Sequence, residues 1–153
     1  MDYISGIFSN FNLLSVGIAW MSAQIIKIFT GYFQDEHINL RKLLFGTGGM
    51  PSSHSATVVA LMVSVAMKEG TYGFNFAISC LLAIIVMSDA VGVRYETGKQ
   101  ARLLNKMVEE LFSSNHENVN AKLKELIGHT PLQVFMGAIL GVVVPVLLNL
   151  IIG

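Results

Sequence analysis

Three short polar clusters interrupt an otherwise apolar chain, and each carries residue types that bind anions or transfer protons. The first is Gly48-Gly49-Met50-Pro51-Ser52-Ser53-His54-Ser55. The second is Asp89-Ala90-Val91-Gly92-Val93-Arg94, which Gly98-Lys99-Gln100 follows, and the third is Gly128-His129-Thr130-Pro131. Each stands at the end of a long uncharged run, so the helices that these runs predict decide whether the clusters meet.

The first cluster has the pattern of an anion site. A glycine-rich approach to a helix N-terminus presents unpaired backbone N–H groups and the positive end of the helix dipole. Ser52 and Ser53 add hydroxyl donors, and His54 in the first turn can give a proton to a bound oxyanion. The same spacing equally fits a helix that Ser52 or Ser53 caps while His54 extends to water.

The third cluster predicts a helix start. Thr130 suits the N-cap, Pro131 the first helical position, and Gln133 the third position of a capping box. This interpretation leaves His129 unexplained. A second histidine at the same depth as His54 favours a functional pair.

The second cluster contains charged residues. Asp89 and Arg94 could form an ion pair at a helix end, because an acid at the edge of an uncharged run is costly without a partner. Arg94 and Lys99 also suit a phosphate. His37 and His116 lie in polar loops and are interpreted as solvated. No histidine spacing typical of a metal site occurs, so neither a metal nor another cofactor is expected.

The elements that position these clusters are predicted by composition. Of the 153 residues, 53% are hydrophobic and 13% charged, against about 25% charged in ordinary globular proteins. The segments 3–26, 43–67, 70–88 and 126–153 carry no formal charge, and each can supply the roughly 20 residues of a transmembrane helix. We therefore predict an all-α integral membrane bundle, one domain over 1–153, with about four transmembrane helices. Their expected spans are about 13–29, 52–67, 74–91 and 131–152.

Small and polar residues predict how the spans pack. Ser15, Ser22 and Gln24 interrupt the first span, which suits a helix that faces other helices. Ala56, Ala60 and Ser64 form a small-residue stripe on the second, and Gly137 and Gly141 have GxxxG spacing on the fourth.

The polar insert 92–128 between spans three and four predicts an amphipathic interfacial helix. Its apolar positions lie opposite its charged ones: Ala101, Leu104, Val108, Leu111 and Phe112 against Arg102, Lys106, Glu109 and Glu110. This helix would lie on the membrane surface or cover the end of the bundle. A shorter helix is expected to end at Gly128.

Charge also predicts orientation and excludes one class of partner. Nine of the ten basic residues fall either from the last turn of span one to the start of span two or between spans three and four, whereas Lys68 lies at the opposite side. This bias predicts a protein of the inner or plasma membrane with both termini outside and the polar clusters facing the cytoplasm. Ten basic residues balance ten acidic ones, so nucleic acid is not an expected partner. The sequence is compatible with a homo-oligomer.

The motifs resemble those of a known enzyme superfamily. Pro51-Ser52-Ser53-His54 resembles the Pro-Ser-Gly-His signature of type-2 phosphatidic acid phosphatases and vanadium-dependent haloperoxidases, and 128–134 resembles their final histidine motif. The set GGMPSSHSA, DAVGVR, GKQARLLN and GHTPLQV, within 48–141, is similar to a divergent bacterial and plastid branch.

This resemblance implies a role for each matching residue. His129 would be the nucleophile that forms a phosphohistidine, His54 the general acid, and Ser52 and Ser53 would hold the phosphoryl oxygens without a metal. Gln133 stands where the family has a carboxylate that orients the nucleophile.

Other family positions have no direct match in this chain. Asp89 could supply the orienting charge from another helix. Lys27 or Arg41 would replace an absent lysine–arginine motif, and Arg94 a second missing arginine.

Two functions therefore compete. The first is a metal-independent membrane lipid phosphate phosphatase that acts at the cytoplasmic face. The alternative is a non-catalytic membrane protein that binds, senses or translocates a phosphorylated lipid. Both imply membrane lipid and a lipid phosphate as partners. Gln133 favours the alternative, whereas the presence of both His54 and His129 favours the enzyme.

Overall fold

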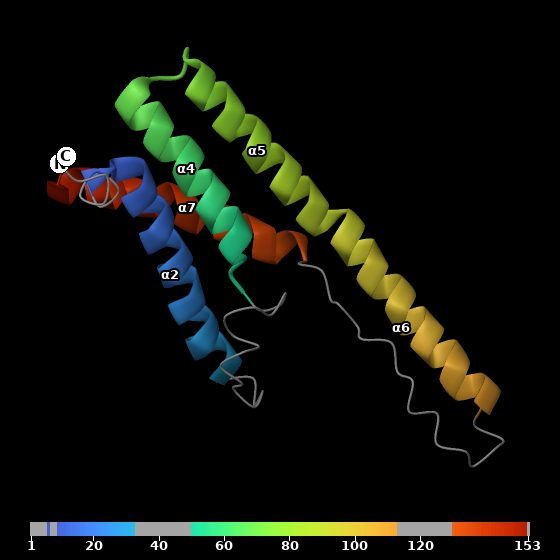
Figure 1. The fold of residues 1–153 in the computed structure, drawn as a ribbon. Helices are drawn as coiled ribbons and strands as arrows, with labels where there is room; N and C mark the ends of the chain where they lie inside the picture. The colour runs from blue at the N-terminus through green and yellow to red at the C-terminus, as the bar shows by residue number, and fades with distance from the viewer. Residues whose placement is uncertain (1–5, 7–8, 33–49, 113–129, 153) are drawn as a thin grey trace.

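The computed structural model describes residues 6, 9–32, 50–112 and 130–152, and in these ranges the chain is all-α. Five helices make up this part (Figure 1): α2 (Phe11–Tyr32), α4 (Ser53–Glu69), α5 (Phe74–Val91), α6 (Val93–Phe112) and α7 (Pro131–Ile152). The third and fourth predicted spans coincide with α5 and α7. The first span is longer than predicted at both ends.

Helix α4 is the centre of the bundle and packs against α2, α5 and α7. Its predicted small-residue stripe is buried, with Ala56, Ala60 and Ser64 all at 0% exposure. Ala19 and Ala23 from α2 and Val144 from α7 complete the cluster around Ala56 and Ala60. Small side chains let these helices approach closely, which is how membrane helices gain packing energy.

The GxxxG pair on α7 makes the closest approach. A Cβ on Gly137 would lie 2.3 Å from the carbonyl oxygen of Ser52, and one on Gly141 would lie 2.6 Å from that of Ala56. Only glycine fits at either position, so the predicted packing role of this pair is confirmed. The contact at Gly137 also fixes the start of α4 against α7.

Within the residues that the structure describes, three helical stretches are long and apolar enough to cross a membrane, rather than the four predicted: Phe11–Thr30, Phe74–Val108 and Pro131–Ile152. The predicted second span is α4, which has 17 residues and is therefore about 26 Å long. That length is at the lower limit for crossing a hydrocarbon core of about 30 Å. The bundle thus contains three candidate spans and a shorter helix at its centre.

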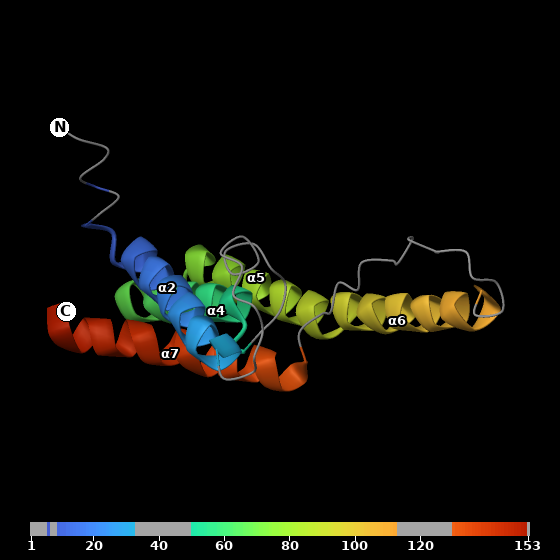
Figure 2. The ribbon, with the colours of Figure 1, turned by 90° about the horizontal axis from the view of Figure 1, so that it is seen from below.

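The predicted amphipathic helix is α6. Helical bonding continues from α5 into α6 across Gly92: the Gly92 N–H donates to Ser88 O at 2.8 Å, and the Glu96 N–H donates to Gly92 O at 3.0 Å. Figures 1 and 2 show α6 extending away from the bundle in line with α5. Among the described helices, α6 contacts α5 alone. The shorter helix predicted before Gly128 lies outside the described residues.

Polar contacts identify the two ends of the bundle. At one end the Glu69 carboxylate accepts hydrogen bonds from Asn12 Nδ2 of α2 at 3.3 Å and from Asn75 Nδ2 of α5 at 2.6 Å. Lys68 lies over the Phe11 ring there, 4.4 Å from its centroid. The start of α4, the start of α7 and the last turns of α2 therefore gather at the opposite end.

Candidate functional site

Ser52 is the N-cap of α4 and is fully buried. Its Oγ accepts from the Ser55 N–H at 3.4 Å and from Ser55 Oγ at 3.0 Å. Its own N–H donates to the carbonyl oxygen of Gln133 in α7 at 2.9 Å. The capping interpretation is therefore confirmed for Ser52, whose hydroxyl oxygen is engaged by the helix and whose backbone joins α4 to α7.

Lys27 reaches the same helix start from α2. Its Nζ donates to Ser53 Oγ at 3.2 Å, and the two side chains are only 8% and 4% exposed. No acidic side chain in the described ranges pairs with this ammonium group. A buried cation without a counter-ion is costly unless an anion joins it. The structure thus brings together two of the predicted phosphate-binding residues.

Thr30 strengthens this junction, and the sequence alone did not single it out. Its Oγ1 shares one proton between two carbonyl oxygens, that of Met50 at 3.0 Å and that of Lys27 at 3.2 Å. The hydroxyl therefore ties the segment before α4 to the turn of α2 that carries the lysine. Thr30 lies one turn beyond Lys27 on α2, and this helical spacing is the feature of the sequence that could have identified it.

His54 occupies the next position of α4, and its side chain is exposed. Ser53 and Lys27 are buried beside the first turn, whereas His54 stands at its surface. The buried ammonium and hydroxyl could hold an oxyanion at the helix N-terminus, and the exposed His54 is the next residue along α4. This arrangement suits binding together with proton donation.

The predicted capping box of α7 is confirmed. The Thr130 N–H donates to Gln133 Oε1 at 3.0 Å, and the Gln133 N–H donates to Thr130 Oγ1 at 3.4 Å. The side-chain oxygen of Gln133 is thereby used by the cap. His129 directly precedes Thr130 in the sequence but lies outside the described residues, so its role as nucleophile and its orientation by Gln133 stay predictions.

Asp89 belongs to the same end of the molecule. It is half-buried in the last turn of α5, and both ribbon views place the junction of α5 and α6 beside the start of α7. Arg94 lies in the first turn of α6, but its side chain is outside the described part. Arg41 is also outside the described residues.

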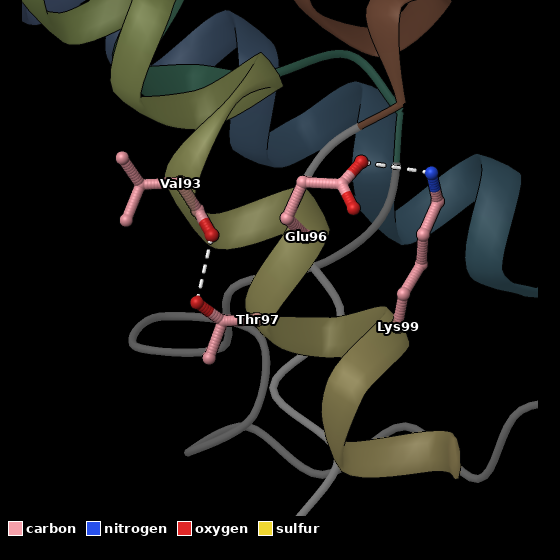
Figure 3. Close-up of polar contacts among 4 residues, drawn as sticks. All are labelled: Val93, Glu96, Thr97 and Lys99. Atoms are coloured by element: carbon pink, nitrogen blue, oxygen red, sulfur yellow. Dashed lines mark hydrogen bonds and ion pairs between the residues drawn. The ribbon is translucent and has the colours of Figure 1, made fainter.

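Lys99, a predicted phosphate-binding residue, does not lie with this cluster. Figure 3 shows its ammonium directed at Glu96, with the two charged atoms 2.8 Å apart, and it also lies 4.4 Å from the centroid of the Tyr95 ring. The Thr97 hydroxyl in the same view donates to Val93 O at 2.7 Å, a bond within the helix. The physical reason is the continuous bonding across Gly92, which carries Lys99 along α6 and away from α4.

Within the ranges that the structure describes, no group of three histidine, cysteine, aspartate or glutamate side chains is placed to hold a metal ion. The donors that do converge are an ammonium group, hydroxyl groups and backbone N–H groups, which bind anions.

Comparison with known proteins agrees with the resemblance in the motifs. Residues 8–144 match the model of the Divergent PAP2 family. The chain is also 38% identical, over 152 residues, to the uncharacterized membrane protein YuiD of Bacillus subtilis (strain 168), a match that covers 93% of this chain and 96% of the relative. No solved structure matches the fold significantly. The chain is therefore a membrane protein that belongs to the Divergent PAP2 family.

Proposed function

We propose that this protein is a metal-independent membrane lipid phosphate phosphatase that acts through a phosphohistidine on His129. The observation that carries the proposal is the buried contact between Lys27 and Ser53 at the start of α4, 3.2 Å long and without an acidic partner among the described residues. Membership of the Divergent PAP2 family supports the same chemistry. The site would face the cytoplasm, with α4 as a fourth crossing and both termini outside.

The reaction follows from the charges that these residues offer. Lys27, Ser53 and the first N–H groups of α4 would hold the phosphoryl oxygens and stabilise their negative charge. His129 would attack phosphorus, forming a P–N bond while the P–O bond to the lipid breaks. His54 would protonate the departing alkoxide. Water would then cleave the P–N bond, releasing inorganic phosphate and regenerating the free imidazole.

One observation favours a second function, a non-catalytic protein that binds, senses or translocates a phosphorylated lipid. Gln133 replaces the carboxylate expected beside the nucleophile, and its Oε1 accepts the Thr130 N–H of the cap. A neutral amide in place of a carboxylate costs a serine protease about 10⁴ in turnover. The same pocket would then bind phosphate without hydrolysing its ester.

The test is release of inorganic phosphate from a panel of lipid phosphates by purified protein in EDTA. We expect His129→Ala to abolish release. We expect His54→Ala to lower it by about 10²–10⁴, with recovery on substrates that have good leaving groups. Lys68→Met, at the opposite end of the bundle, is the control for loss of a lysine charge. Wild-type protein that binds a lipid phosphate yet releases no phosphate from the panel would refute the enzyme and support the binder.

A further inference from the structure

Gln24 is a buried side chain that neither the fold nor the proposed mechanism uses. It is 8% exposed, and its Oε1 has no hydrogen-bond partner among the residues that the structure describes. It stands on the face of α2 that packs into the bundle, next to Ala23, which contacts the α4 cluster. A buried acceptor without a donor is destabilising, so its presence needs an explanation.

The position of Gln24 relative to Lys27 supplies an explanation for this unpaired acceptor. The two residues are three apart on the same helix, so their side chains are neighbours on one face, with Cβ atoms about 5–6 Å apart. Both are more than nine-tenths buried, and Lys27 already directs its ammonium at Ser53. A ligand bound to that ammonium would therefore have an unused acceptor beside it.

We propose that Gln24 is a ligand-binding residue of the anion site and that its Oε1 accepts the proton of a singly protonated phosphate group. This inference rests on the proposed function in that both use the anion site at Lys27. It adds the protonation state of the phosphate group that the site selects. This is a phosphate or phosphomonoester monoanion, which carries one P–O–H donor.

The chemistry predicts selectivity between two anions of the same shape. Sulfate at neutral pH is tetrahedral and negatively charged but has no proton to donate, so it would place a bare oxygen against Gln24 Oε1. Phosphate retains a proton and can satisfy that acceptor. One hydrogen bond made by phosphate but not by sulfate corresponds to about a tenfold difference in affinity.

The experiment measures dissociation constants of inorganic phosphate and of sulfate for the full-length protein in detergent. We expect wild type to bind phosphate at least about tenfold more tightly than sulfate. Gln24→Met keeps the length of the side chain and removes its polar atoms. It should weaken phosphate binding about tenfold and leave sulfate binding unchanged.

Ser15→Ala is the matched control. Ser15 is also on α2, fully buried, and its Oγ has no partner in the described part of the chain. It lies nine residues before Gln24 and twelve before Lys27, about 14 Å and 18 Å along the helix, so its removal should change neither dissociation constant.

Three outcomes overturn the inference: equal wild-type affinity for both anions, unchanged phosphate affinity in Gln24→Met, or binding of neither anion. A failure of the proposed function looks different, because phosphate selectivity that depends on Gln24 with no release of phosphate from lipids would refute the phosphatase and leave this inference intact.

Discussion

Gly137→Ala tests whether the contact between α7 and α4 holds the site in place. A Cβ at this position would lie 2.3 Å from the Ser52 carbonyl oxygen, whereas real Cβ atoms are essentially never closer than 3.0 Å. The two helices must therefore separate by at least about 0.7 Å at the cap of α4. Overpacking lowers the free energy of unfolding by about 1–3 kcal/mol. The better helix propensity of alanine offsets about 0.5–1 kcal/mol of that loss. We expect a net destabilisation of about 1–2 kcal/mol.

The effect on activity should be larger than the effect on stability. Ser52 precedes both Ser53 and His54, and its N–H bonds to α7, so a separation here moves the site itself. A misplacement of about 1 Å can cost 10²-fold in rate.

The assays are thermal unfolding in detergent and phosphate release from lipid phosphates. Gly17→Ala in α2 is the control, because nothing lies within 4 Å of a Cβ there, and it should match or exceed wild-type stability. Wild-type stability and activity in Gly137→Ala would refute this account of the interface.

Three other perturbations test separate parts of the site. Lys27→Met should leave the protein folded, because it removes a buried charge without an acidic partner in the described residues, yet inorganic phosphate should no longer raise its melting temperature. Gln133→Glu can still accept the Thr130 N–H, so the cap should survive while the added carboxylate raises phosphate release; unchanged release would argue that Gln133 does not orient His129. A reporter enzyme fused after Gly153 should be active only outside the cytoplasm, and cytoplasmic activity would reverse the predicted orientation.

Local patterns explain most of what could be predicted from the sequence. The capping box joins Thr130 and Gln133, three residues apart, so its hydrogen bonds depend on the local helix start alone. The buried stripe of Ala56, Ala60 and Ser64 and the pair Gly137 and Gly141 follow from helical periodicity. The long uncharged runs identified the helices because a bilayer core excludes charge over about 20 residues.

Helix length and continuity were harder to predict. The sequence indicated about four spans, but α4 has 17 residues and stands at the lower limit for crossing. The predicted third span ended at residue 91, and a separate polar insert was expected from residue 92. In the structure, backbone bonds pass through it and carry Lys99 away from the site.

The assembly of the site was decided by tertiary structure. Lys27 and Ser53 are 26 residues apart, and Ser52 and Gln133 are 81 apart, so no local pattern could pair them. Their contacts depend on the rotation of α2 about its axis and on how closely α7 approaches α4, and packing of alanines and glycines sets both. The amino-acid types identified residues that could bind an anion, and the close packing of three helices determined which cation lies beside Ser53.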